Sequence, residues 1–450
     1  MTTVADPPLW SARYRVTTTG VFALAFLVAF ESFAVATVMP LVGHEFGDYG
    51  SYALAFAAPI AVSVFGIRLA GPWIDRAGPA PALYTGVVVF AGGVVGAAAA
   101  TDMTVFLAAR AVQGLGAGLV GVSLYVVVAA AYPEQLRARV FTVLTSAWLL
   151  PALLGPPLAG ALADGFGWRW VFAVAPVPAV VAVAALIPAL RGTAAPGAGD
   201  QPWSLGRGAV AAVAVLGLGI AGQRSVAGWP VVLLVSLVAV AWAVPRLLPR
   251  GTWRFGPGLP ALLAARALAG AAFFGVEVYV PLALVQFRGY SPAAAGGFLT
   301  LSAVAWFAGS WLAAHARMLA DPVRRIRIGV VALVAAIPVT ATVAAPAVRT
   351  IVPLLGWGLA GLGIGLAFVS ASVLLLDWSP PERTGANTAA MQVNDAVGQS
   401  LWLSVGAVVF GLSHATGWGF AAVFAGAAVV AAAAGAASGR LRVSGPATTS

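Results

Sequence analysis

Polar side chains capable of ion or proton chemistry occur inside long apolar stretches of this sequence, and five of them are considered first. Arg110 and Gln113 lie one helical turn apart, and three acids stand in other apolar runs, namely Glu31, Glu277 and Asp395. A carboxyl group favours its neutral form among apolar side chains, whereas water or a nearby arginine favours the carboxylate. A group that alternates between such surroundings binds and releases protons. The five residues are therefore candidates for proton coupling or substrate binding, and the alternative for each acid is a structural hydrogen bond.

Glu31 is the natural partner of Arg110, because a guanidinium in an apolar segment requires an opposite charge. The run around Glu31 is otherwise apolar, so we expect Glu31 to carry the coupling proton, with Asp395 as the next choice. Glu277 is expected to influence substrate affinity or the preference for cations. Asp395 lies among three amides that are consistent with a cavity wall, Gln392, Asn394 and Gln399.

Six aromatic residues offer rings on which an aromatic or cationic substrate could stack. Packing and lipid contact are the commoner uses of such rings, and we favour them for most of this set. The six are Trp148, Trp306, Trp311, Phe273, Phe274 and Tyr279.

The sequence offers poor support for other chemistries. It contains no cysteine, and its three histidines fall in loops or at helix ends without the spacing of a metal site or a catalytic triad. No predicted strand precedes the glycine-rich segment 114–118, and nothing resembles a P-loop. We therefore expect no enzyme activity, no metal and no cofactor, with an ion gradient as the energy source. A membrane-embedded enzyme or a non-transporting receptor is the alternative from a different class.

The elements that must position these residues are helices that cross a lipid bilayer. Of 450 residues, 61% are hydrophobic and only 8% are charged, against about 25% charged in a soluble domain. The first apolar run, 20–42, is too long for the hydrophobic region of a signal peptide. The predicted fold class is an all-α integral membrane protein with about fourteen transmembrane helices. The other runs lie near 51–74, 80–100, 105–131, 138–163, 169–190, 208–223, 229–248, 259–287, 293–315, 326–345, 350–376, 385–412 and 418–437.

The basic residues are distributed unevenly between the loops. All 24 are arginine, and the net charge is +10. They concentrate in alternate loops, as in the cluster 324–327, which favours lipid headgroups over nucleic acid as their partners. If these loops are cytoplasmic, both termini and the segment 191–207 are cytoplasmic too. We therefore expect a multi-pass protein of the cell inner (plasma) membrane that handles a small-molecule substrate as a functional monomer.

A glycine motif occurs twice, about 247 residues apart. The residues 114–118, GLGAG, recur as 361–365, GLGIG, and Trp357 stands where the repeat of Arg110 would fall, so we expect the second half to lack a counterpart of this arginine. Such repeats predict two related six-helix halves with a site between them near the middle of the membrane, as in secondary transporters. The expected domains are a first bundle over 1–190, a linker with two extra transmembrane helices over 191–258, and a second bundle over 259–450.

Four motifs resemble those of the major facilitator superfamily. Residues 71–78, GPWIDRAG, resemble its loop signature G-x-L-a-D-r-x-G, and residues 110–116, RAVQGLG, resemble its fourth-helix motif R-x-x-Q-G-x-G. Residues 155–160, GPPLAG, resemble its antiporter motif G-P-x-x-G-G. Residues 31–40, ESFAVATVMP, are similar to the first-helix pattern of its fourteen-helix drug–proton antiporter branch. The chain departs from these patterns at Pro79, Ala80, Ala159 and Glu31.

The resemblance implies roles for two of these segments. The loop would be a conformational latch, with a surface turn as the alternative, and its residues are Gly71, Asp75, Arg76 and Gly78. The prolines of the antiporter motif would interrupt the fifth helix and serve gating or export, and its residues are Gly155, Pro156 and Gly160. The implied function is export of small molecules, drug-like and hydrophobic or cationic, by proton antiport with alternating access. The alternative is a proton-coupled importer of a nutrient or metabolite.

Overall fold

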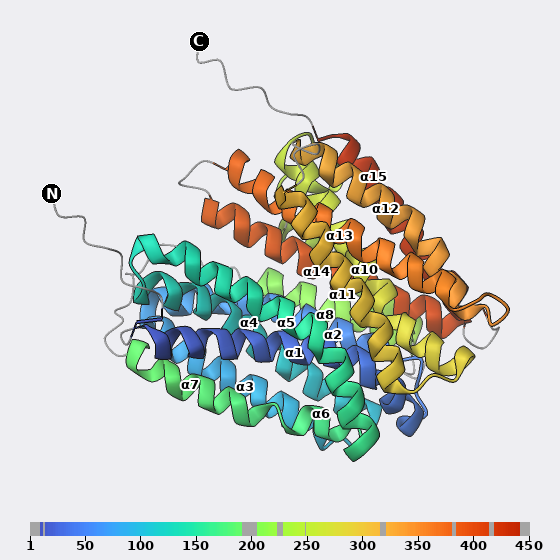
Figure 1. Ribbon diagram of the computed structural model, residues 1–450, viewed down its shortest axis with the longest axis horizontal. Coiled ribbons are helices and arrows are strands. Elements are labelled where there is room, and N and C mark those ends of the chain that lie inside the picture. Colours follow the sequence, from blue (N-terminus) through green and yellow to red (C-terminus); the bar gives the residue numbers. More distant parts are fainter. Residues whose placement is uncertain are drawn as a thin grey trace, which may run out of the picture.

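The computed structural model describes residues 10–11, 14–190, 205–222, 228–247, 249–315, 321–379, 384–413 and 418–441. Within these ranges all regular structure is helical, which confirms the predicted all-α class (Figure 1). Some sequence predictions fall on residues outside these ranges. They concern most of the linker 191–207, one of the three histidines, His414, and six of the loop arginines whose distribution predicts the orientation: Arg13, Arg191, Arg224, Arg317, Arg383 and Arg442.

The first bundle holds six spans, the last of which is broken. Its helices are α1 (Arg15–Phe46), α2 (Leu54–Ala77), α3 (Pro79–Ala98), α4 (Met103–Ala131), α5 (Glu134–Phe166), α6 (Arg169–Ala173) and α7 (Pro176–Leu190). The sequence predicted a continuous helix over 169–190, whereas two turn residues separate α6 from α7. The prediction that prolines interrupt the fifth helix is wrong, because α5 continues through Pro151, Pro156 and Pro157.

The remaining helices follow the predicted order. The extra pair is α8 (Leu205–Gly222) and α9 (Trp229–Leu247), followed by the 3-10 turn η1 (Thr252–Arg254). The second bundle comprises α10 (Leu259–Arg288), α11 (Pro292–His315), α12 (Pro322–Ala341), the turn η3 (Thr342–Ala344), α13 (Ile351–Trp378), α14 (Thr384–Ser413) and α15 (Gly419–Gly439). With α6 and α7 counted as one span, the described chain has fourteen helices, and eleven segments are long and apolar enough to cross a membrane.

The repeated glycine motif lets three helices pack closely in each half. On α4, a Cβ added to Gly114 would lie 2.1 Å from the Pro59 carbonyl oxygen of α2, and one on Gly116 would lie 2.3 Å from the Phe90 nitrogen of α3. On α13, a Cβ on Gly365 would lie 2.1 Å from the Trp306 carbonyl oxygen of α11. Only glycine fits such contacts between helix backbones. The sequence repeat is therefore also a repeat of packing.

The two bundles lie side by side, the first in blue to green and the second in yellow to red (Figure 1). They meet where α5 packs on α11 and α2 packs on α14, while α1 contacts both α10 and α11. The extra helix α8 also contacts both α2 and α14. An apolar cluster joins these three helices and α9, with Val64 on α2, Val215 on α8, Val244 on α9 and Val397 on α14.

Candidate functional site

The candidate residues of the first bundle form one buried polar cluster. Arg110 on α4 donates from Nη1 to Glu31 Oε1 on α1, as the sequence predicted, and to Gln113 Oε1 at 2.5 Å. Its Nε donates to the Ala55 carbonyl oxygen of α2 at 3.1 Å. The exposed fractions are 5% for Glu31, 3% for Arg110 and 2% for Gln113. The cluster therefore links three helices through one guanidinium shielded from solvent.

Local sequence explains how these side chains meet. Gln113 follows Arg110 by three residues, so both side chains lie on one face of α4. Gly114 then allows α4 to approach α2 until the Pro59 backbone would touch any added side chain. That approach also brings the carbonyl oxygen of Ala55, one turn before Pro59, within reach of Arg110. Removing one partner of such a buried ion pair costs about 3–5 kcal/mol, so Glu31 and Arg110 depend on each other.

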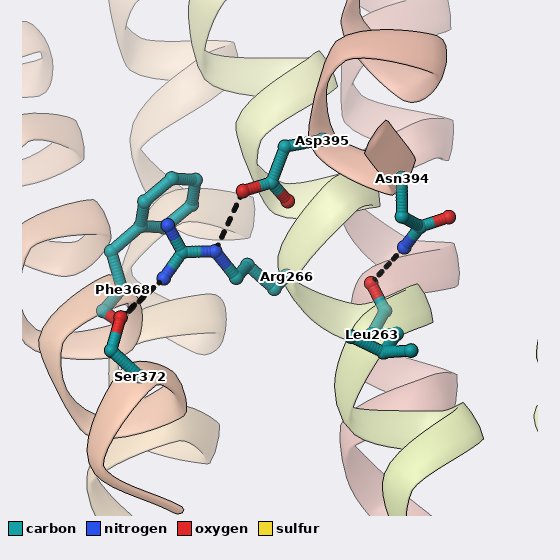
Figure 2. Close-up of polar contacts among 6 residues, drawn as sticks. All are labelled: Leu263, Arg266, Phe368, Ser372, Asn394 and Asp395. Carbon is teal, nitrogen blue, oxygen red and sulfur yellow. Dashed lines mark hydrogen bonds and ion pairs between the residues drawn. The ribbon is translucent and has the colours of Figure 1, made fainter. Parts of the chain in front are cut away.

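A second ion pair, partly buried, lies in the other bundle (Figure 2). Arg266 on α10 donates from Nε to Asp395 Oδ2 on α14 at 2.8 Å. Its Nη1 donates to the Phe368 carbonyl oxygen at 2.8 Å and to Ser372 Oγ at 2.9 Å, both on α13. The guanidinium carbon also lies 4.0 Å from the centroid of the Phe368 ring. One arginine again links three helices and satisfies an acid.

Arg266 is the site residue that sequence reasoning missed. The second bundle was expected to lack an arginine counterpart because Trp357 replaces Arg110 in the repeat, and that expectation is corrected by the Arg266–Asp395 pair. The arginine comes from the first helix of its bundle instead of the fourth. The signal was present, since Arg266 stands inside the apolar run 259–287 just as Arg110 stands inside its own.

The amides near Asp395 do not form a single polar strip. Asn394 is buried and donates from Nδ2 to the Leu263 carbonyl oxygen of α10 at 2.6 Å (Figure 2). Gln392 is exposed and Gln399 is partly buried, so the three amides have different surroundings. Asn394 and Asp395 thus fasten α14 to α10 at two successive positions.

Glu277 is a partly buried acid beside an aromatic cluster. It follows Arg266 by eleven residues, about three turns, so both face the same side of α10. Among described side chains it has no ion-pair or hydrogen-bond partner. Between the two charges, Phe273 stacks on Trp357 with centroids 4.7 Å apart, and Trp306 packs on Phe273 at 5.4 Å. The Trp306 ring also contacts the rings of Phe274 and Phe368, which extend this cluster.

Most of the other aromatic candidates are packing residues or lie at the surface. Tyr279 is buried against Phe410, at a centroid distance of 5.0 Å, and lies 6.0 Å from Tyr52. The side chain of Trp311 is half exposed. The position of the Trp148 side chain lies outside the described part of the structure. Only Phe273, Phe274 and Trp306 therefore lie near a candidate charge.

The predicted loop signature forms the turn between α2 and α3. Gly78 ends α2 and begins α3 with a positive φ of 77°, which explains the need for glycine. Asp75 is partly buried, while Arg76 is exposed and donates to the Pro72 carbonyl oxygen at 3.0 Å. A Cβ on Gly71 would meet no other atom within 4 Å. The turn has the expected tight geometry, and the role of Asp75 as a latch stays a prediction.

The predicted antiporter motif lies where the two bundles meet. A Cβ on Gly160 would lie 2.5 Å from the Ala293 Cα of α11, and one on Gly296 would lie 2.7 Å from the Pro156 carbonyl oxygen. Gly155 instead has Phe33 of α1 at 3.5 Å from its added Cβ. The motif therefore permits close contact between α5 and α11, whose separation must change if the bundles move apart.

Comparison with known proteins agrees with this architecture. Residues 21–403 match the model of the Major Facilitator Superfamily, which covers most of the chain. The chain belongs to the Major Facilitator Superfamily. It is accordingly a multi-pass membrane transporter and not an enzyme.

Similar proteins include transporters named for drug efflux. A probable multidrug-efflux transporter of Mycobacterium tuberculosis (strain ATCC 25618 / H37Rv) is 26% identical over 406 residues, with 85% of each chain covered. The multidrug transporter protein MdtP of Bacillus subtilis (strain 168) is 24% identical over 174 residues, which cover 39% of this chain and 32% of that protein.

Solved structures share the fold at low identity. A POT family transporter in complex with a thioalcohol-conjugated peptide has a TM-score of 0.69 at 11% identity, with 94% of each chain covered. The human organic anion transporter MFSD10 has a TM-score of 0.62 at 17% identity, covering 96% of this chain and 100% of that one. These similarities concern the fold alone.

Proposed function

We propose that this transporter exports small hydrophobic or cationic molecules in exchange for protons, by alternating access, as a member of the fourteen-helix drug–proton antiporter branch. The observation that carries the proposal is the buried cluster of Glu31, Arg110 and Gln113. A carboxylate and a guanidinium at this depth are costly and rarely serve packing alone. The proton gradient supplies the energy, no cofactor is needed, and the functional unit is the monomer.

Proton coupling follows from the contacts of Arg110. A proton on Glu31 neutralises the acid and weakens its ion pair with Arg110. The guanidinium keeps two other acceptors, Gln113 Oε1 and the Ala55 carbonyl oxygen, so it stays bonded when the pair weakens. Since α1 and α4 are then held less tightly, protonation of Glu31 favours a different arrangement of the bundle. Moving one charge across a membrane potential adds about 2.3 kcal/mol per 100 mV to this bias.

The choice of drug-like substrates is supported by two observations. Two similar bacterial proteins are named multidrug or multidrug-efflux transporters. In this chain, Phe274 precedes Glu277 by three residues on α10, and its partly exposed ring contacts the partly exposed ring of Trp306. A carboxylate next to aromatic faces attracts organic cations, through charge and through the negative face of each ring.

Gating and orientation complete the proposal. Asp75 at the α2–α3 turn latches the bundles, and separation of α5 from α11 at Gly160 opens the transport path. Both termini are cytoplasmic and the protein lies in the plasma membrane, because arginines concentrate in the corresponding loops.

Transport by purified protein in liposomes tests this function. Substrate counterflow, followed with a panel of fluorescent cationic and neutral drugs, measures exchange, and an imposed pH gradient then measures coupling. Export predicts that drug accumulates in the compartment with the higher proton concentration. Accumulation in the opposite compartment supports the proton-coupled importer, and drug movement that ignores the pH gradient contradicts proton coupling.

A further inference from the structure

The second ion pair differs from the first in how its two charges are held. Arg266 has three contacts on α13 besides its acid: the Phe368 carbonyl oxygen, Ser372 Oγ and the Phe368 ring (Figure 2). These contacts stabilise the guanidinium in place whether or not Asp395 is charged, because hydrogen bonds and ring contact both compensate a cation. Arg266 is therefore a fixed positive charge.

The carboxyl group of Asp395 has fewer hydrogen bonds than its two oxygens could accept. Its Oδ2 accepts from Arg266, but Oδ1 is buried and has no hydrogen-bond partner among the described residues. The Glu31 carboxylate, in contrast, has no buried oxygen without a partner in the described chain. A buried carboxylate oxygen without a hydrogen-bond donor loses its hydration, and no protein hydrogen bond compensates this desolvation cost. Binding a proton removes that cost, since the acid becomes neutral while Arg266 keeps its other acceptors.

We propose that Asp395 is a second proton-binding site, so that the transporter exchanges two protons per substrate molecule, one at Glu31 and one at Asp395. The proposal rests on proton antiport as the function. The proton enters from water onto the carboxylate and leaves when the pair with Arg266 forms again. The two sites lie in different bundles, and each acid pairs with an arginine from another helix of its own bundle.

The charged groups on the neighbouring helices are few. Helix α10 supplies Arg266 and, three turns further along the same side, Glu277. Helices α2 and α8 carry Arg68 and Arg207, which interact with one another electrostatically. On α13, the neutral side chain of Ser372 accepts a hydrogen bond from Arg266. Helix α15 contains no charged residue. Among the described residues, Arg266 is the charged group that forms an ion pair with Asp395.

Helix α14 connects this acid with the contact between the bundles. Val393 and Val397, two residues to either side of Asp395, belong to the apolar cluster with Ala61 and Val64 of α2. On its other side, α14 is fastened to α10 through Asp395 and Asn394. Loss of the ion pair removes one of these two contacts between α14 and α10. Protonation of Asp395 therefore weakens the attachment of α14 to α10 when the bundles separate.

Infrared spectroscopy tests the proton site without a substrate. A carboxyl group gains a C=O band when it binds a proton, so the difference spectrum between pH about 9 and pH about 6 reports buried acids that titrate in this range. In lipid nanodiscs we expect Asp395→Asn to lose one band that the wild type and the exposed control Asp377→Asn retain. Identical spectra for the wild type and Asp395→Asn overturn the proposal.

A second variant keeps the test decisive if Asp395→Asn does not fold. Arg266→Gln removes the fixed cation and leaves the acid, so the same band should persist to higher pH. A band that titrates unchanged in Arg266→Gln contradicts the pairing on which the proposal depends.

Stoichiometry gives an independent measurement. Liposomes with the membrane potential held at zero by valinomycin and equal potassium accumulate radiolabelled ethidium to a ratio set by the pH difference. Each proton contributes about tenfold for one pH unit. We expect about 100-fold accumulation for the wild type and about 10-fold for Asp395→Asn; equal ratios overturn the two-proton mechanism. If the wild type fails to accumulate ethidium, proton-driven export of this cation fails, and the infrared result still decides whether Asp395 binds a proton.

Discussion

Gly114 offers the sharpest test of how packing positions the charged cluster. In Gly114→Ala, the new Cβ would lie 2.1 Å from the Pro59 carbonyl oxygen and 2.4 Å from the Pro59 Cα. Backbone atoms cannot rotate away, so α4 must move outward from α2 by roughly an ångström to restore ordinary contact. Overpacking of this kind costs about 1–3 kcal/mol, which exceeds the roughly 1 kcal/mol that alanine gains over glycine in a helix. Movement also lengthens the Arg110–Ala55 hydrogen bond.

The matched control is Gly121→Ala on the same helix, where the added Cβ meets nothing within 4 Å. Thermal unfolding in detergent, followed by the fluorescence of the 15 tryptophans, measures both variants. We expect a lower unfolding temperature and reduced transport for Gly114→Ala, and an unchanged or higher temperature for Gly121→Ala. Equal stability and transport in the two variants would refute the argument that close approach of α4 positions Arg110.

Three further predictions concern other parts of the molecule. Asp75→Asn should reduce the transport rate severalfold while leaving the amount of folded protein unchanged in gel filtration; normal turnover would leave this turn with a role in insertion only. Glu277→Gln should weaken binding of cationic drugs about tenfold or more and leave neutral drugs unaffected, measured by tryptophan quenching; an equal loss for both classes would contradict a charge effect. Arg288→Ala should lower stability by about 3 kcal/mol in denaturant unfolding, because Arg288 donates to four carbonyl oxygens and one hydroxyl near η3, and Arg288→Lys should rescue little; full stability of the lysine variant would contradict the need for a planar guanidinium.

Much of the fold could be predicted from the sequence because membrane helices have long apolar runs and characteristic motifs. Long apolar runs identified the spans, and the repeated glycine motif identified two helices that pack closely in their bundles. The Glu31–Arg110 pair was also predictable, since the two residues are opposite charges in the apolar spans of one bundle. These features depend on composition and spacing along single helices.

The features that sequence did not predict depend on how helices rotate against one another. Asn394 faces α10 and Gln392, two residues earlier, faces away from it, but spacing along α14 alone could not establish which face of this helix meets α10. Arg266 lacked an obvious partner because Asp395 lies 129 residues away. Helix α5 stays continuous at Pro156, because a helix can lose one backbone hydrogen bond and bend while its neighbours hold it in place.

The central claim is that Glu31 carries a coupling proton, and Glu31→Gln tests it directly. The glutamine keeps the size of the acid and mimics its protonated form, so the variant cannot alternate between charged and neutral states. In liposomes we expect downhill drug exchange to continue while uphill, pH-driven accumulation falls from about 100-fold to about 10-fold for one pH unit, the part that Asp395 supplies, with the exposed-acid variant Asp164→Asn behaving as the wild type. If Glu31→Gln still accumulates drug against its gradient with the wild-type dependence on pH, Glu31 is not a coupling residue.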